Sequence, residues 1–154
     1  MIIYFGADHG GFELKAHLME VLRSQGYEVE DMGDTKIVED DDYPDFARAV
    51  AEKVATDTER QRGVLICRSG VGMDVVANKF ANIRSVLAIS GDHVYAARHD
   101  DDVNILTIAS DFTDKAQAEK MLEVFMTTPF GADQRYKRRL EKISEIENQN
   151  FVQK

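Results

Sequence analysis

The residues best suited to chemistry in this chain are Cys67 and the loop that follows it. The run Cys-Arg-Ser-Gly-Val-Gly (67–72) comes directly after the apolar stretch Gly-Val-Leu-Ile (63–66). A thiol at the carboxyl end of a buried strand stands where open α/β sheets bind ligands. The pattern of residues 73–80 predicts a helix whose first-turn N–H groups face the loop. Such a setting is expected to lower the pKa of a cysteine, so the pattern predicts a thiol base or nucleophile beside an oxyanion or phosphate site.

The loop does not fit the common phosphate-binding signatures. A Walker loop ends in Gly-Lys-Ser/Thr, and a dinucleotide fingerprint has a third glycine and follows a different strand. A cysteine phosphatase has an arginine six residues after the cysteine, where this chain has Met73. A lone cysteine is often only a small buried hydrophobic residue, but Ser69, Gly70 and Gly72 favour a functional loop here.

Two further polar groups stand where they could bind a ligand. Asp8 and His9 follow the apolar start of the chain and precede Gly-Gly (10–11). They could bind hydroxyls or phosphate or, equally, supply a helix cap and a solvated histidine. Arg135 and Arg139 share one helical face, from which both could bind one phosphate. A solvated basic face is the usual alternative, but basic residues at the start of a helix are mildly unfavourable unless a ligand is bound.

The aspartates of the run Arg-His-Asp-Asp-Asp-Val-Asn (98–104) are a weak candidate for a metal site. Adjacent carboxylates at a helix end do not converge on one ion without other ligands. We therefore predict no metal site. His17 and His93 are expected on helix surfaces and are given no role.

These residues lie within a regular alternation of apolar strands and amphipathic helices. The βαβα order is typical of an α/β fold, in which a parallel sheet is covered on both faces. Strands are expected at 2–5, 27–29, 63–66, 86–89 and 105–109, and helices at 12–22, 43–54, 73–80, 92–99, 115–126 and 134–148. Gly26 is expected to end the first helix, and Pro44 suits the first turn of the second. The last helix, in a segment of about 133–148, has few strongly apolar positions, so we expect it at a subunit interface.

The composition indicates a soluble protein of one domain, residues 1–154. This length is enough for one self-sufficient core, and 44% hydrophobic with 31% charged residues is ordinary for a globular chain. The net charge of -9 argues against nucleic acid as the main partner. No apolar run reaches the roughly 18 residues of a membrane span. The single cysteine cannot form an internal disulfide, which favours a cytoplasmic location.

Several ordered motifs together resemble one family. They are Gly6-x-Asp8-His9-x-Gly11-Phe12-x-Leu14-Lys15, Asp42-Tyr43-Pro44-Asp45, Cys67-x-Ser69-Gly70-Val71-Gly72, Ala77-Asn78-Lys79-Phe80 with Ile83-Arg84, and Arg135 with Arg139. In this order they resemble the type B ribose-5-phosphate isomerases and the related galactose-6-phosphate isomerase subunits, over nearly the whole chain. The resemblance implies a three-layer α/β/α sandwich with a five-stranded parallel, Rossmann-like sheet. It also implies an aldose–ketose isomerase of sugar phosphates that needs no metal or cofactor and forms a homodimer or tetramer with shared active sites.

The resemblance also implies a role for each matching residue. Cys67 would be the base that moves a proton between C1 and C2 of the sugar, beside Ser69, and the backbone N–H groups of residues 69–73 would hold the enediolate oxygen. Relatives that lack the cysteine use a glutamate at the position of Met73, so the resemblance places this chain in the cysteine branch. Substrate binding falls to Asp8, His9, Tyr43, Arg68, Gly70, Val71, Gly72, Met73, Asp101, Arg135 and Arg139.

Three residues depart from the family pattern. Arg68 stands where the family usually has glycine, and Asp111 stands where its fifth strand commonly ends in a phosphate-binding arginine. Counting without gaps places Asp100 at the position of the histidine that opens the sugar ring. A shift in register would bring His99 there instead, so either residue could take the catalytic ring-opening role.

These departures leave more than one function open. A substituted ring-opening histidine favours a substrate that stays open, and an aldotetrose 4-phosphate cannot form a furanose because the attacking hydroxyl carries the phosphate. We therefore predict an isomerase of the ribose 5-phosphate/ribulose 5-phosphate type, or one acting on a tetrulose phosphate. The alternative is a non-catalytic or hetero-oligomeric sugar-phosphate-binding subunit, because galactose-6-phosphate isomerases pair two related chains. A thiol-dependent phosphatase is disfavoured by Met73.

Overall fold

A computed structural model of the chain describes residues 1–151. It contains five strands: β1 (Ile2–Ala7), β2 (Glu28–Asp31), β3 (Gln61–Cys67), β4 (Ser85–Leu87) and β5 (Ile105–Ala109). It contains six helices: α1 (Phe12–Ser24), α2 (Tyr43–Val54), α3 (Val71–Ala77), α4 (Gly91–Asp101), α5 (Lys115–Thr127) and α6 (Gln134–Phe151). None of these helices is long and apolar enough to cross a membrane.

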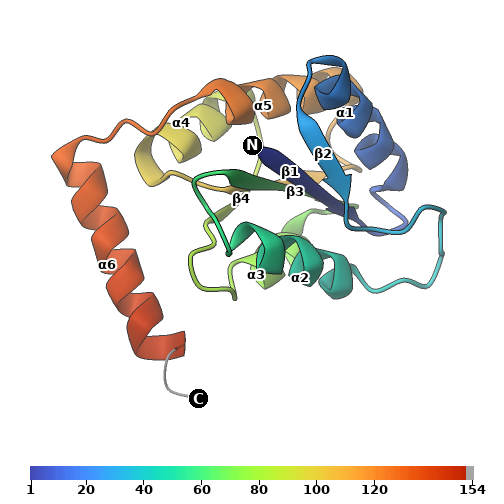
Figure 1. The fold of residues 1–154 in the computed structure, drawn as a ribbon. Coiled ribbons are helices and arrows are strands. Elements are labelled where there is room, and N and C mark those ends of the chain that lie inside the picture. The colour runs from blue at the N-terminus through green and yellow to red at the C-terminus, as the bar shows by residue number, and fades with distance from the viewer. Residues whose placement is uncertain (152–154) are drawn as a thin grey trace.

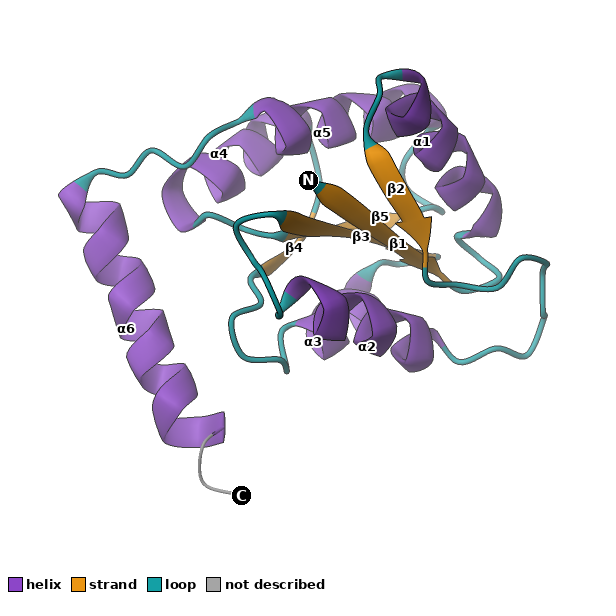
Figure 2. Ribbon diagram, in the orientation of Figure 1, coloured by secondary structure: helices purple, strands orange, loops and turns teal. Residues whose placement is uncertain are grey.

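The strands form one parallel sheet in the order β2-β1-β3-β5-β4, and helices cover both of its faces (Figure 1). Helices α1, α4 and α5 lie on one face, and α2 and α3 lie on the other (Figure 2). The predicted three-layer α/β/α sandwich with a five-stranded parallel sheet is therefore confirmed. The physical reason is that every central strand is apolar on both sides and must be covered twice.

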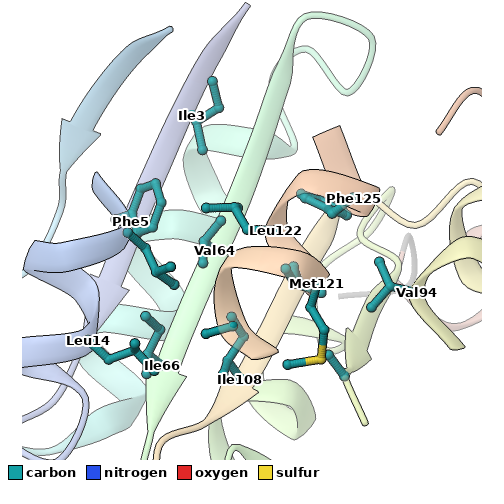
Figure 3. Close-up of a cluster of buried hydrophobic side chains, with 14 of the residues drawn as sticks. Ile3, Phe5, Leu14, Val64, Ile66, Val94, Ile108, Met121, Leu122 and Phe125 are labelled. Atoms are coloured by element: carbon teal, nitrogen blue, oxygen red, sulfur yellow. The ribbon is translucent and has the colours of Figure 1, made fainter. Parts of the chain in front are cut away.

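Alternate residues of the strands build two separate cores. Ile3, Phe5, Val64 and Ile66 pack under α1 and α5, with Leu122 and Phe125 contributed by α5 (Figure 3). On the opposite face, Tyr4, Leu65, Cys67 and Ile105 pack against α2 and α3. Cys67 thus belongs to the second core and lies at its edge.

The boundaries of the elements around Cys67 differ slightly from those predicted. Strand β3 runs through Cys67 itself, and α3 begins at Val71 rather than at Met73. Gly70 is the reason, because its positive φ of 73° turns the chain sharply from strand to helix. The other predicted glycine signal is confirmed, since Gly26, with φ 86°, ends α1.

The order of the sheet makes the carboxyl ends of β1 and β3 the expected place for a ligand-binding crevice. These strands are neighbours, but the chain leaves β1 for α1 on one face, whereas it leaves β3 for α3 on the other. Such a reversal opens a crevice beyond the carboxyl ends of the two strands. Asp8 and Cys67 lie at those ends.

Helix α6 stands away from the sandwich (Figure 1). Only Tyr136 of this helix is buried, whereas Ile143, Ile146 and Phe151 are exposed. A groove of about 660 Å³ separates α6 from β4, α4 and the loop between α3 and β4. Exposed apolar side chains beside a groove are characteristic of a protein interface.

Candidate active site

Cys67 is the last residue of β3 and is only 5% exposed. Its sulfur accepts a hydrogen bond from the backbone N–H of Gly70 at 3.2 Å. The left-handed conformation of Gly70 directs this N–H back toward the sulfur, and a Cβ at this position would collide with Leu87. The predicted loop of backbone donors around the thiol is therefore present.

The electrostatic balance at the thiol differs from the prediction. Burial raises the pKa of Cys67 above its ordinary value, and the nearby carboxylate of Asp8 raises it further. Hydrogen bonds from the N–H groups of Gly70, Met73 and Ser69 act in the opposite direction without overcoming burial. The prediction that this setting lowers the pKa was wrong, because α3 has only seven residues and the sulfur is enclosed by the core. The resting group is a neutral thiol.

Asp8 follows β1, at the carboxyl end of the strand next to β3. Its Oδ1 accepts hydrogen bonds from the N–H groups of Gly10 at 3.0 Å and Gly11 at 3.2 Å. These bonds close the turn before α1, whereas the N-cap of that helix is Gly11 and has no side-chain cap, so the interpretation of Asp8 as a helix cap was wrong. Asp8 is also buried, which raises its pKa, and it lies close enough to Cys67 to influence the thiol. One residue therefore shapes the turn and contributes charge to the crevice.

His9 is not the solvated histidine of the alternative interpretation. Its Nδ1 lies 2.6 Å from Oδ1 of Asp41, and its backbone N–H donates to the same oxygen at 3.2 Å. Sequence reasoning missed Asp41, because it is one of four consecutive acidic residues (39–42) and nothing in the run distinguishes it. The hydrogen bond to Asp41 raises the pKa of His9.

Tyr43 and Gly72 bring the start of α2 against the start of α3. A Cβ built on Gly72 would lie 2.5 Å from Cζ of Tyr43, so the aromatic ring covers the backbone of the loop. Tyr43 is exposed, and its ring lies against Gly72 in the loop that follows Cys67. Val71, by contrast, is exposed on α3, and Met73 is buried beneath the loop.

Arg68 lies across the top of the crevice. Its aliphatic stem packs on Gly10, and its Nε is 3.7 Å from Oδ2 of Asp111. Arg68 and Asp111, which both depart from the family pattern, are therefore in contact with each other. Arg68 remains 69% exposed, so the pair leaves its guanidinium accessible to an anion.

Ser110 joins the loops that follow β1 and β3, and no motif in the sequence pointed to this residue. Its hydroxyl donates to the carbonyl of Gly10 at 2.8 Å, and its backbone N–H donates to the carbonyl of Cys67 at 2.9 Å. The carboxyl ends of β1, β3 and β5 are thus held together by one small side chain.

A second group of predicted residues lies where α4 ends and α6 begins. The His99 ring is stacked on Tyr95 and meets Tyr136 edge-on. Its Nδ1 lies 2.7 Å from Oδ1 of Asp100, and the pKa of Asp100 is lowered chiefly by this hydrogen bond. His99 and Asp100, which were alternatives for one role, form a pair. The hydrogen bond to Asp100 occupies Nδ1 of His99.

The two arginines of α6 belong to this second group. The guanidinium carbons of Arg135 and Arg139 lie 4.5 Å and 5.9 Å from the centre of the Tyr136 ring. Their predicted common face is therefore confirmed. Asp101 is exposed, and its backbone carbonyl accepts from Nε of Arg84 at 3.0 Å.

Within one chain, the two groups of predicted site residues lie at opposite ends of the strands: one at the carboxyl ends and one at the amino ends. Cys67 pairs with Ala109 at the carboxyl end of β5, whereas Asp101 precedes the amino end of that strand. Helix α4 has 11 residues and is about 16 Å long, and it separates Asp101 from the Cys67 edge. The predicted site residues thus form two sets, and one chain does not bring them together.

Only one group within residues 1–151 brings three possible metal ligands together. The ligand atoms of Asp8, His9 and Asp41 lie within 4.8 Å of one another. The aspartates of 100–102 do not converge: Asp102 binds Arg84 and Arg98, and Asp100 binds His99.

Comparison with known proteins supplies independent evidence. Residues 3–143 match the model of the ribose/galactose isomerase family. The chain is 34% identical over 147 residues to a probable ribose-5-phosphate isomerase B of Mycoplasma genitalium, with 96% of both proteins covered. It is 35% identical over 147 residues to ribose-5-phosphate isomerase B of Mycobacterium tuberculosis, covering 96% of this chain and 90% of that protein. A crystal structure of ribose-5-phosphate isomerase B from Mycoplasma genitalium with bound ribulose-5-phosphate has a TM-score of 0.94 at 34% identity, with 97% of both chains covered.

Proposed function

The chain belongs to the ribose/galactose isomerase family, and we propose that it interconverts an aldose phosphate and a ketose phosphate with Cys67 as the base. Membership of this family and the names of its relatives support the class of reaction, an aldose–ketose isomerisation of a sugar phosphate. The role of Cys67 is carried by one observation, the N–H of Gly70 held 3.2 Å from a buried sulfur at the end of β3.

The proposed reaction is a proton transfer between neighbouring carbons. In the aldose-to-ketose direction, the Cys67 thiolate removes the proton from C2. The electron pair of that bond forms a C1–C2 double bond, and the carbonyl oxygen on C1 takes the negative charge. The thiol then returns its proton to C1, and the proton on O2 passes to O1, which leaves a ketone at C2 and a hydroxyl at C1. No redox partner is needed.

The loop supports this reaction through its backbone donors. The N–H groups of Gly70, Met73 and Ser69 already face the position of the sulfur, where they favour negative charge. Donors at this position stabilise the thiolate, which must form before the proton can be abstracted. Because burial raises the pKa of Cys67, its thiolate is scarce but strongly basic, which suits abstraction of a weakly acidic C–H proton.

We further propose that a second copy of the chain completes the site. The residues expected to bind phosphate, Arg135 and Arg139, lie near the amino ends of the strands of their own sheet, whereas Cys67 lies at a carboxyl end. A homodimer in which the partner presents the start of α6 to the crevice would bring both sets together. The exposed Ile143 and Ile146 of α6 support an interface on this helix.

Two observations bear on the sugar. The relatives named ribose-5-phosphate isomerase B favour a pentose phosphate, and His99, whose Nδ1 is held by Asp100, retains a second ring nitrogen that could open a furanose. The residue at the family's ring-opening position is nevertheless Asp100 by direct counting, which favours a tetrulose phosphate as second candidate. Turnover of ribose 5-phosphate without turnover of erythrose 4-phosphate would exclude the tetrose substrate.

The base is tested with Cys67→Ala and Cys67→Ser. Proton exchange between the substrate and deuterated water should fall by at least about a hundredfold in both variants, while the far-ultraviolet circular dichroism stays unchanged. A folded Cys67→Ala variant that keeps full exchange would refute the proposed base.

The alternative function is a sugar-phosphate-binding subunit that requires a different catalytic partner. The observation that favours it is the distance of His99, Arg135 and Arg139 from Cys67 within one chain. Full turnover by the purified single chain would exclude this alternative. Binding of ribose 5-phosphate without turnover, restored by a related second chain, would establish it.

A further inference from the structure

One aspartate of the acidic run 39–42 behaves differently from its neighbours. Glu39, Asp40 and Asp42 are exposed, whereas the side chain of Asp41 is only 8% exposed. A carboxylate loses hydration when it is buried and needs compensating hydrogen bonds. Asp41 finds them in His9, and this contact joins the loop between β2 and α2 to the end of β1.

Both contacts are made through one oxygen, and they define the orientation of His9. Oδ1 of Asp41 receives the backbone N–H at 3.2 Å and lies 2.6 Å from Nδ1. Among the described residues, the hydrogen bonds of the His9 ring are confined to Nδ1. With Nδ1 donating to a carboxylate, Nε2 is the nitrogen left for a ligand.

The loop that carries Asp41 is anchored at its base. Nζ of the buried Lys15 donates to Oδ1 of Asp31 at 2.7 Å and to the carbonyl of Asp34 at 3.2 Å. The N–H of Met32 also donates to the carbonyl of Phe5 at 2.8 Å. The position of Asp41 is therefore determined by the tertiary structure rather than by the loop alone.

The charged groups around His9 come from three segments. Asp8 precedes it, Asp41 comes from the loop before α2, and Arg68 comes from the loop after β3. The two carboxylates favour the imidazolium form, and Arg68 opposes it. The hydrogen bond to Asp41 has the largest effect, so the pKa of His9 is raised. The charged form of His9 is thus favoured beside the exposed guanidinium of Arg68.

We propose that Asp41 is a positioning residue: it orients His9 so that Nε2, together with Arg68, binds the anionic end of the substrate. This inference rests on the proposed isomerase function and adds a residue that no family motif above contains. It assigns no proton transfer to Asp41. The carboxylate acts only through the charge and the orientation of the imidazole.

The test compares two substitutions that remove the same charge from the same loop. Asp41→Asn keeps the shape of the side chain but loses its charge, and Asp40→Asn is the matched control because Asp40 is exposed. For ribose 5-phosphate, KM of the Asp41→Asn enzyme should rise roughly tenfold between pH 6 and pH 8, as His9 loses its proton near the ordinary histidine value. KM of the wild type and of Asp40→Asn should change much less. Asp41→Glu should restore part of the wild-type profile.

A second readout does not depend on turnover. The His9 imidazole is titrated by NMR in the full-length protein, with His9→Gln to assign its signal, and binding of inorganic phosphate is measured by calorimetry. The inference predicts a lower pKa of His9 and weaker phosphate binding at pH 8 in Asp41→Asn, with no such change in Asp40→Asn. Coincident titration curves and KM profiles of the two variants would overturn it. If every protein lacked isomerase activity, the proposed function would fail, and the titration and phosphate binding would still decide the role of Asp41.

Discussion

The backbone N–H of Gly70 points at the sulfur of Cys67 from 3.2 Å, and a left-handed turn that few other residues adopt makes this contact possible. The turn joins β3 directly to α3, so the donor and the thiol are fixed by two elements of secondary structure. The contact explains how a buried thiol can form an anion at all, since burial by itself opposes its ionisation.

Gly70→Ala is expected to damage both stability and activity. The new Cβ would meet Leu87 at a positive φ, which together should cost about 1–3 kcal/mol of the free energy of unfolding. Displacement of the N–H should lower kcat by roughly tenfold or more. Urea denaturation and steady-state kinetics measure the two effects. Gly26→Ala is the matched control, because φ is 86° there but nothing lies near the new Cβ. The Gly26→Ala variant should lose about 1 kcal/mol of its free energy of unfolding and keep its kcat. If both variants lost kcat equally, the proposed role of Gly70 would be contradicted.

The activity should increase with pH into the alkaline range. Because the pKa of Cys67 is raised above its ordinary value of 9.0, kcat/KM should climb with the thiolate fraction and show its inflection above pH 9. The same shift makes stability fall there, since the unfolded thiol ionises first as pH increases. A pH series of kcat/KM with the wild-type enzyme measures the inflection. In denaturation experiments, Cys67→Ala should lack the part of the alkaline decrease in the free energy of unfolding that Cys67 causes. A plateau already reached at pH 7 would show that the thiol ionises more easily than burial predicts.

Arg68→Ala should weaken substrate binding with little loss of stability. Arg68 and Asp111 form an exposed pair at 3.7 Å, and such pairs contribute less than about 1 kcal/mol to the free energy of unfolding. KM for the sugar phosphate should rise by roughly tenfold, and the difference should shrink as salt screens the charge. Arg48→Ala is a close control, since Arg48 is 68% exposed and also paired with a carboxylate, but on the outer face of α2. Similar KM values for the two variants would exclude Arg68 from the site.

Two inactive variants should restore activity when they are mixed as subunits. If the partner supplies Arg139, a mixed dimer of Cys67→Ala and Arg139→Ala chains contains one intact site and one doubly substituted site. Random reassociation after unfolding should then recover about a quarter of wild-type activity. Each variant refolded alone should stay inactive. Absence of recovery, with mixed dimers verified by mass spectrometry, would place the complete site within one chain.

Much of the architecture was predictable because it depends on local patterns. The apolar run 105–109 has the bounds of β5, and Pro44 and Gly26 mark where α2 begins and α1 ends. Each of these signals depends on a residue and its near neighbours in the chain. The ends of α3 and β4 were displaced by a few residues, because the turn at Gly70 and the length of β4 depend on packing between elements.

The candidate site also has features that were predictable from the sequence and features that depend on the fold. The sequence alone determined its chemical groups, the thiol of Cys67, the carboxylate of Asp8 and the glycines of the loop, because residue type and order along the chain carry that information. Three features required the folded chain: burial raises the pKa of Cys67, Asp41 is the acidic residue that contacts His9, and His99 lies far from the carboxyl end of β3. Desolvation and charge interactions depend on distances between segments far apart in sequence, such as the 32 positions between His9 and Asp41. Those distances exist only after the chain has folded.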